Sequence, residues 1–254
     1  MTKPRVLVTG GGVRVGRAIS LSLAKAGYAL AVHYRSRAQE AEAFAQEVNA
    51  QYGAGTAVTI ACDLSLTNDV AQMIPRLVAA HGPLAGLVNS ASVFEDDRLE
   101  TLTRAGWDLH LDTNLWAPVV LIQAFAKQLP QGLEGSVVNL LDQGVLKLNP
   151  QFLSYTVSKT ALWTLTRTLA QALAPHIRVN GVGPGPTLAS IHQSAEGFAA
   201  QARATLLQRP SPPEDIAAAV VYLMQARSVT GHMIPVDCGQ HLAWETPDVV
   251  LTKG

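Results

Sequence analysis

The sequence has little charge. Asp, Glu, Lys and Arg make up 15% of its 254 residues, and 19 basic side chains balance 19 acidic ones. Proteins that bind nucleic acid usually present an excess of basic residues, so this balance gives no reason to expect such a partner. It also argues against a disordered chain, which combines high net charge with few apolar residues. We expect a well-buried globular protein that acts on a small molecule.

Cysteines and long hydrophobic runs are also scarce. Cys62 and Cys238 lie far apart and lack the spacing of metal ligands, so we expect reduced thiols in a cytoplasmic protein and no metal site. The longest early apolar run, residues 6–8, is too short for the core of a signal peptide, and no run approaches a membrane span. The sequence therefore predicts no membrane contact.

What the sequence has is a regular alternation of short β-forming runs and longer helical patterns. We predict seven strands, at 5–9, 29–33, 56–61, 84–89, 136–141, 177–182 and 233–236. We predict helices at 15–26, 38–52, 67–80, 103–129 (with a break near Asp112), 153–173 and 213–225. This alternation requires right-handed crossovers and a parallel sheet covered on both faces. Residues 1–254 are thus predicted to form one α/β domain, a doubly wound seven-stranded parallel sheet of the Rossmann type.

Two helical segments are almost free of charge. Residues 115–129 contain only Lys127 as a charged side chain, and residues 161–174 only Arg167. A helix that is apolar all round must be covered on all sides. Other helices of the same chain could cover it, but we favour a symmetric oligomer in which these helices meet their copies. Two further segments are expected to have their own roles: residues 187–207 cover the substrate, and residues 245–254 form a tail or a subunit contact.

The glycine-rich stretch at 10–16 links the first predicted strand to the first predicted helix. A strand, a tight glycine turn and a helix N-terminus together form a natural cradle for phosphate, with Gly10, Val15 and Gly16 in contact. The stretch does not match G-x-G-x-x-G, because position 15 is Val. Position 14, where such a loop would tolerate glycine, is Arg14.

The basic N-terminal part of the chain indicates which nucleotide is bound. The first acidic residue is Glu40, and the second predicted strand ends in His33, Tyr34, Arg35 and Ser36. A carboxylate near this position would hold the ribose 2′-OH of NAD, whereas arginines and a serine suit the extra phosphate of NADP. Together with Arg14, this pattern favours NADP(H). The alternative is that Arg35 and Arg37 are ordinary solvated loop charges.

Other polar residues follow the later strands, whose carboxyl ends face the same crevice. Asp63 and Leu64 close the third strand, where the carboxylate could meet the adenine amino group or could be a loop or capping acid. Asn89, Ser90 and Ala91 end the fourth strand beside the nucleotide. Pro184, Gly185 and Thr187 form a rigid turn at the mouth of the crevice.

The chemical centre is predicted at the start of the helix 153–173. Tyr155 and Lys159 are four residues apart and so share one helix face. A nearby ammonium lowers the pKa of a tyrosine, which makes Tyr155 a possible proton donor to a substrate being reduced. Asp142 leaves the fifth strand at the same crevice. Asn114 could reach Lys159 through water, by its backbone or by its side chain.

These motifs, in this order, resemble the short-chain dehydrogenase/reductase family. The resemblance rests on Thr9-Gly10 with Gly16, Asn89-x-Ala91, Asn114, Tyr155-x-x-x-Lys159 and Pro184-Gly185, and it covers nearly the whole chain. It implies Tyr155 as the acid–base, Lys159 as the group that lowers its pKa and holds the nicotinamide ribose, and Asn114 in a water-linked proton relay. It also implies a homotetramer through the helices 115–129 and 153–173. The residues expected to bind the cofactor are Gly10, Arg14, Val15, Gly16, His33, Tyr34, Arg35, Ser36, Asp63, Leu64, Asn89, Ser90, Ala91, Tyr155, Lys159, Pro184, Gly185 and Thr187.

Three departures are similar to the pteridine reductase branch of that family. They are Arg14 in the glycine loop, Asp142 at the usual serine position, and Ser90, Ser92 and Phe94 around the usual Asn-Asn-Ala-Gly. The resemblance implies that Phe94 stacks on a pterin against the nicotinamide. It also implies that Ser92 and Tyr155 bond to the pterin or cofactor, and that Asp142 helps to protonate or orient the heterocycle. A buried Asp142 would have a raised pKa, which suits a ring nitrogen that must gain a proton.

The sequence thus predicts an NADPH-dependent reductase of a pterin-type substrate, a dihydropterin or dihydrofolate, with Tyr155 as proton donor. One alternative is a ketone or 3-oxoacyl reductase of the same family, in which Asp142 only shapes its loop. The other is a non-catalytic NADP sensor or scaffold. The intact Tyr155–Lys159 pair argues against a sensor, which needs no acid.

Overall fold

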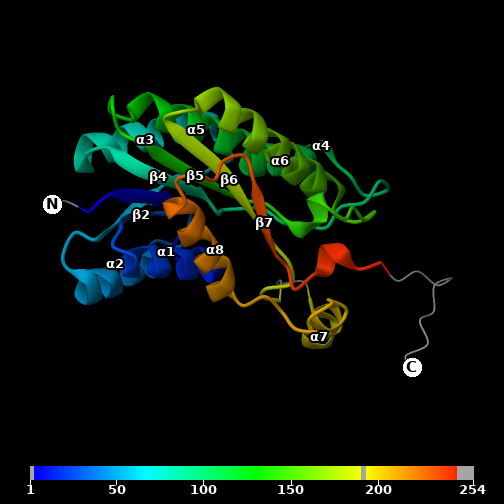
Figure 1. Ribbon diagram of the computed structural model, residues 1–254. Coiled ribbons are helices and arrows are strands. Elements are labelled where there is room, and N and C mark those ends of the chain that lie inside the picture. Colours follow the sequence, from blue (N-terminus) through cyan, green and yellow to red (C-terminus); the bar gives the residue numbers. More distant parts are fainter. Residues whose placement is uncertain (1–2, 190–192, 245–254) are drawn as a thin grey trace.

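The protein forms one seven-stranded parallel sheet with helices on both faces (Figure 1). The computed structural model describes residues 3–189 and 193–244. The strands are β1 (Arg5–Val8), β2 (Ala29–Tyr34), β3 (Ala57–Ala61), β4 (Leu84–Asn89), β5 (Gly135–Leu140), β6 (Ile177–Pro184) and β7 (Met233–Val236), in the order β3-β2-β1-β4-β5-β6-β7. The predicted fold class is confirmed, and each strand lies within two residues of its predicted bounds.

Most helices form two layers, one on each face of the sheet, and α7 lies apart from them (Figure 1). The helices are α1 (Arg14–Lys25), α2 (Ala38–Tyr52), α3 (Thr67–His81), α4 (Arg104–Leu111), α5 (Ala117–Gln128), α6 (Leu153–Leu173), α7 (Ala195–Arg203) and α8 (Pro213–Gln225). One core packs α1, α2 and α8 against the sheet, and a second packs α3, α5 and α6 against the other face. The strands read as continuous apolar runs because both of their faces are buried.

The sheet order creates the crevice in which a ligand can bind. The chain proceeds outward from β1 through β2 to β3, then returns to place β4 on the other side of β1. Loops from the carboxyl ends of β1 and β4 therefore diverge, which leaves a crevice at this topological switch point. The glycine loop follows β1, and residues 90–103 follow β4.

The long helix predicted at 103–129 is divided where a break was expected. A five-residue π-helical turn, η1 (Asp112–Trp116), separates α4 from α5. Such turns are rare and occur frequently at functional sites. Here the turn holds Asn114, which is almost fully buried.

Other details differ from the prediction. Helix α7 was not predicted, and the residue before α8 is Pro212, so the nearby Ser211, of a type that often caps helices, does not cap it. The backbone N–H of Ser211 instead donates to the oxygen of Pro186. The predicted tail, residues 245–254, lies outside the described residues, as do residues 190–192 of the predicted substrate-covering segment.

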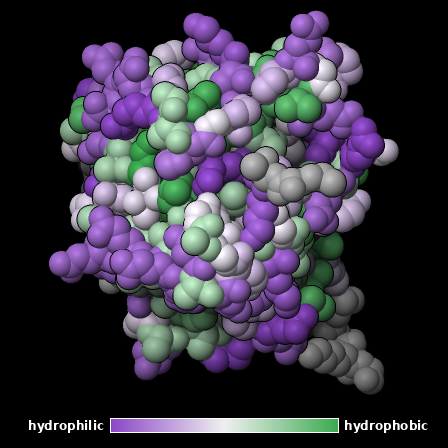
Figure 2. Space-filling view, turned by 90° about the vertical axis from the view of Figure 1, so that its left-hand side faces the viewer, coloured by the Kyte–Doolittle hydropathy of each residue, from purple (hydrophilic) through white to green (hydrophobic). Residues whose placement is uncertain are grey.

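The face at the amino ends of the strands, on the left in Figure 1, is mostly hydrophilic, and its hydrophobic residues form small separate areas (Figure 2). It lies opposite the crevice. Within residues 3–189 and 193–244, no helix combines the length and the hydropathy that a bilayer span needs.

Candidate active site

The glycine loop after β1 is shaped to approach an anion. Gly10 adopts a φ of +64°, and a Cβ on Gly16 would stand 2.1 Å from the backbone oxygen of Gly10, so only glycine fits there. Helix α1 begins at the end of this loop, and no side chain caps its N-terminus. Free backbone N–H groups at such an end attract phosphate.

Arg14 makes contacts that were not predicted from the sequence. It adopts a φ of +49°, a region that favours glycine, as expected for a position where a glycine would fit. Its guanidinium donates to the backbone oxygens of Leu188, at 3.3 Å, and Ala189, at 3.0 Å. The sequence predicts that this charge lies at the 2′-phosphate of NADP. In the structure it holds the segment after β6 and lines both cavities of the site.

The smaller cavity, of about 440 Å³, lies between the glycine loop and the ends of β2 and β4. Its lining includes Arg14, Arg35, Ser36 and Arg37 but no carboxylate among the described residues. The wall nearest the sheet is formed by Ser90, Ala91 and Ser92. A glycine cradle at a helix N-terminus with exposed guanidinium groups beside it fits a dinucleotide that carries an extra phosphate.

Three residues predicted to bind the cofactor also have partners within the fold. His33 is buried; its Nε2 donates to the oxygen of Cys62 and its Nδ1 accepts the N–H of Gly10, both at 3.0 Å. Burial lowers the pKa of His33 and so favours the neutral ring that this pattern needs. The Asp63 carboxylate accepts bonds from the backbone and hydroxyl of Ser65, which lower its pKa, as the loop-acid alternative proposed. Leu64 is buried in the core.

Asn89 also has a structural partner. Its side chain is buried and donates to Oδ1 of Asn139 on β5 at 2.8 Å. The hydroxyl of Thr9 accepts the N–H groups of Ser90 and Ala91, both at 2.9 Å. These bonds tie β1, β4 and β5 together at the base of the crevice.

Tyr155 meets Asp142, which the resemblance placed beside it, and Lys159 lies near the Tyr155 ring. The Tyr155 hydroxyl donates to Oδ2 of Asp142 at 2.9 Å, and Oδ1 of Asp142 accepts the N–H of Gly144 at 2.7 Å. The Lys159 ammonium lies 5.6 Å from the centre of the Tyr155 ring and donates to the oxygen of Leu140 at 2.8 Å. All three groups are thus fixed by hydrogen bonds from different elements.

The ionisation of this group differs from the prediction in one respect. Burial raises the pKa of Asp142, as expected. Burial also raises the pKa of Tyr155 well above its ordinary value, and the adjacent Asp142 charge adds to this effect. The prediction that Lys159 would lower the pKa of Tyr155 is therefore wrong for the protein alone, because desolvation and the carboxylate dominate. Burial lowers the pKa of Lys159 itself to about 8, although the Asp142 charge opposes this shift.

Asn114 holds the loop after β4 rather than contacting Lys159. Its Oδ1 accepts from the Val93 N–H at 2.8 Å and the Ser92 hydroxyl at 3.1 Å, and its Nδ2 donates to the Val93 oxygen and the Ser158 hydroxyl. The amide therefore has no free polar group for a water-mediated relay. The sequence left open whether Asn114 reaches Lys159 through water by its side chain or by its backbone, and only the backbone of Asn114 remains available.

The larger cavity, of about 710 Å³, adjoins the smaller one at Arg14 and Val15. Its walls include Asp142, Tyr155 and two aromatic rings, Phe94 and Phe152. The rings of Phe94 and Phe152 are stacked at 4.3 Å, and the Phe94 ring meets the edge of Tyr155 at 4.7 Å. Phe152 was missed in the sequence because it precedes the helix and has no motif of its own.

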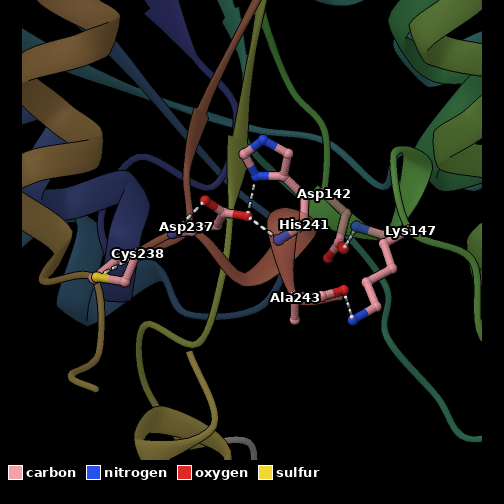
Figure 3. Close-up of polar contacts among 9 residues, drawn as sticks. Asp142, Lys147, Asp237, Cys238, His241 and Ala243 are labelled. Atoms are coloured by element: carbon pink, nitrogen blue, oxygen red, sulfur yellow. Dashed lines mark hydrogen bonds and ion pairs between the residues drawn. The ribbon is translucent and has the colours of Figure 1, made fainter. Parts of the chain in front are cut away.

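The turn after β6 packs on a buried carboxylate, Asp237, that no motif in the sequence indicates. Asp237 accepts bonds from the backbone N–H groups of Gly239 and His241 and from Nδ1 of the His241 ring, the last at 2.7 Å (Figure 3). A Cβ on Gly185 would stand 2.7 Å from the Cα of Asp237, so only glycine allows this contact. Pro184, Gly185 and Thr187 line the larger cavity at the place predicted for them.

Comparison with known proteins identifies the family. The family model described as enoyl-(acyl carrier protein) reductase, of the short-chain dehydrogenase/reductase group, matches residues 12–241. The chain belongs to the short-chain dehydrogenase/reductase family. A 3-oxoacyl-[acyl-carrier-protein] reductase FabG of Staphylococcus epidermidis is 31% identical over 241 residues, covering 93% of this chain and 98% of the relative.

Two solved structures of this family are more similar. FolM alternative dihydrofolate reductase 1 from Brucella suis, in complex with NADP, is 46% identical with a TM-score of 0.93, covering 98% of this chain and 99% of the other. The Brucella canis protein, also complexed with NADP, is 46% identical with a TM-score of 0.90, covering 98% of both chains. These neighbours bear out the predicted class of enzyme, an oxidoreductase, and the predicted NADP(H) cofactor.

Proposed function

We propose that this short-chain reductase uses NADPH to reduce a pterin-type substrate, a dihydropterin or dihydrofolate, with Tyr155 as the proton donor. The observation that carries the proposal is the 2.9 Å bond between the Tyr155 hydroxyl and the partly buried Asp142. A ketone reductase needs one neutral donor at the carbonyl oxygen, whereas a pterin ring presents nitrogens that must gain protons. The 46% identity to proteins named alternative dihydrofolate reductases supports the same conclusion.

The residues that would hold the cofactor line the smaller cavity. We assign its pyrophosphate to the loop containing Gly10, Val15 and Gly16, and the 2′-phosphate to Arg35, Ser36 and Arg37. Ser90 and Ala91 are in the adjoining wall, and Lys159 and Tyr155 lie where β5 ends. When bound, NADPH supplies the hydride.

The protonation steps belong to the chain. Reduction of a ring C=N bond requires one proton in addition to the hydride. The raised pKa of Tyr155 keeps its hydroxyl protonated, so it can donate this proton to the ring nitrogen. The Lys159 ammonium then stabilises the phenolate, 5.6 Å away from its ring. Asp142 binds a proton more readily than an ordinary aspartate, and it returns that proton to Tyr155 along their hydrogen bond.

The walls of the larger cavity suit a flat heterocycle. Phe94 is 40% exposed and lines the cavity together with Phe152, on which its ring is stacked. A pterin ring is apolar on its faces and polar on its rim. The Phe94 ring suits one face, and the Asp142 carboxyl group suits the rim. Leu188, also 39% exposed, adds apolar surface at the opening.

The second candidate is an NADPH-dependent 3-oxoacyl or ketone reductase. It is favoured by the 31% identity to a 3-oxoacyl reductase that spans nearly the whole of both chains. Against it stands Asp142, which places a carboxyl group where that chemistry needs a neutral hydroxyl.

NADPH oxidation with dihydrobiopterin, dihydromonapterin, dihydrofolate and a panel of ketones and 3-oxoacyl thioesters separates the candidates. We expect turnover with at least one dihydropterin. Tyr155→Phe should reduce kcat by a factor on the order of 10² or more, because the proton donor is lost, while NADPH still binds. Turnover of ketones or thioesters alone would refute the pterin substrate. Tight NADPH binding without any turnover would favour the sensor.

A further inference from the structure

Helix α6 carries Tyr155 and Lys159 but lacks a cap of its own. The residue before it, Phe152, adopts a left-handed conformation, and no side chain at that position bonds to the first turn. The first turn of a helix leaves backbone N–H groups without partners inside the helix. Something else must therefore fix the end from which Tyr155 projects.

Asp97, from the loop after β4, takes the role of that cap. Its backbone oxygen accepts the N–H of Leu153 at 3.4 Å, and its carboxylate accepts the N–H of Ser154 at 3.2 Å. The same carboxylate accepts a short hydrogen bond from the Ser154 hydroxyl. The side chain is 7% exposed. A carboxylate at a helix N-terminus is also favoured by the helix dipole.

His110, from α4, completes the cluster. Its Nε2 accepts the N–H of Glu95 at 3.1 Å, so the ring is neutral and carries its proton on Nδ1. Nδ1 lies 2.7 Å from the hydroxyl of Ser154 and 3.1 Å from the oxygen of Gly106. Ser154 thus receives a bond from His110 and donates one to Asp97. Both Ser154 and His110 are almost completely buried, so neither can touch a substrate.

The cluster joins the two walls of the larger cavity. The loop that carries Asp97 also carries Phe94, and the helix turn that carries Ser154 also carries Tyr155. The rings of Phe94 and Tyr155 are 4.7 Å apart, and the rings of His110 and Tyr155 are 6.2 Å apart. Movement between loop and helix would therefore change the distance between the aromatic wall and the proton donor.

We propose that Asp97, Ser154 and His110 are positioning residues that hold the Tyr155 hydroxyl in its reactive place relative to the Phe94 wall. This inference rests on the role of Tyr155 in the proposed function but not on the identity of the substrate. Their effect is on orientation, since a donor displaced by about 1 Å can slow a reaction by up to roughly 10²-fold.

The test compares Asp97→Asn, Ser154→Ala and the double variant with the parent enzyme, using whichever substrate the parent reduces. Asp97→Asn keeps an acceptor oxygen but removes the charge, and Ser154→Ala removes the linking hydroxyl. We expect each to lower kcat by about tenfold. The KM of the substrate and the Kd of NADPH, measured by its fluorescence, should change by less than about twofold. The double variant should be no slower than about the slower single variant, because the residues act as a unit.

Glu100→Gln is the matched control, since Glu100 is exposed on the same loop and outside the cluster. It should leave kcat unchanged. Hydrogen exchange at the amides of Leu153 and Ser154 gives a readout that needs no substrate; it should accelerate in Asp97→Asn but not in the control. Parent-like kcat in both single variants, or a loss of kcat that only follows a loss of folded protein in thermal melts, would overturn the proposal. An absence of turnover with any pterin would instead count against the proposed substrate.

Discussion

Asp142 is the residue on which the choice of chemistry depends. Buried carboxylates resist ionisation, and burial raises the pKa of Asp142 even though Gly144, Tyr155 and Lys159 all act to lower it. The acid form of Asp142 is the form that can return a proton to Tyr155. Activity should therefore be greatest below the pKa of Asp142 and decline as the pH rises through it.

Asp142→Asn should remove this decline, because an amide does not titrate in this range. We expect the variant to be slower by a factor on the order of 10², and its kcat to lack the part of the decline that the ionisation of Asp142 causes. The check is a pH profile of dihydropterin reduction by parent and variant. An unaltered decline in the variant would show that another group controls it.

The same substitution has a consequence for stability with a definite sign. A folded-state pKa above the unfolded value of about 3.9 means that the folded protein holds this proton more tightly. The free energy of unfolding then falls as the pH rises from the unfolded-state pKa of Asp142 through its higher folded-state pKa. Asp142→Asn removes that loss. The Tm of the variant at pH 7, measured by a thermal melt, should therefore be no lower than that of the parent.

At this scale the sequence predicts pairs that are close in the chain and misses those that are not. Tyr155 and Lys159 could be found because helix geometry alone brings residues four apart to one face. Asp97, His110 and Ser154 meet across three elements, and nothing in their spacing indicates it. The predicted effect of Lys159 on Tyr155 was wrong because burial, which decides the shift, cannot be read from the sequence.

At the scale of elements, we expect the turn from β2 into α2 to decide between the two nicotinamide cofactors. Arg35, Ser36 and Arg37 are exposed along the smaller cavity, where no described carboxylate opposes them. Arg14 lines the same cavity but is bonded to Leu188 and Ala189. The turn therefore supplies the freer guanidinium groups.

Arg35→Ala should raise the KM for NADPH by roughly 10-fold to 10²-fold, since a bond to a charged group contributes about 1.5–3 kcal/mol. The KM for NADH should change little, because NADH has no 2′-phosphate, and it serves as the internal control. The double variant Arg14→Ala, Arg35→Ala should show a larger difference between the KM for NADPH and the KM for NADH. Equal losses for both cofactors in steady-state kinetics would contradict the assignment.

The elements that escaped prediction share a physical cause. Helix α7 has nine residues and only one buried side chain, so its sequence lacks the apolar stripe by which longer helices are found. The break near Asp112 was predicted, but its form, a π-helical turn, depends on the packing of Asn114 against Val93 and Ser158. Strands and long helices were predicted well because both faces of the sheet are buried.

At the scale of the whole molecule, the near absence of charge on α5 and α6 still predicts a tetramer. Helix α5 is largely covered within the chain, whereas Val157 on α6 is 40% exposed and Trp116, in the π-helical turn before α5, is 48% exposed. Apolar side chains left open on two adjacent segments are typical of a subunit contact.

Light scattering should give the parent a mass of four times the 26.9 kDa of one chain. Val157→Glu would bury a charge in the contact and should shift the mass to smaller species. Leu133→Glu, at a position 53% exposed in the loop before β5, is the control and should remain tetrameric. A parent of one-chain mass would disprove the tetramer.

The buried His33 is expected to weaken the protein at low pH, whereas ionisation of Asp142 is expected to lower activity at high pH. Its Nδ1 must stay unprotonated to accept the N–H of Gly10, so protonation would place two donors against each other and release the glycine loop. Because the pKa of His33 is lowered in the folded state, that cost develops only as the pH falls below the ordinary value of about 6.5. Protonation of Asp142 favours catalysis, whereas protonation of His33 disrupts the nucleotide loop, so we expect activity within a band of pH bounded by one side chain on β2 and one in the loop after β5.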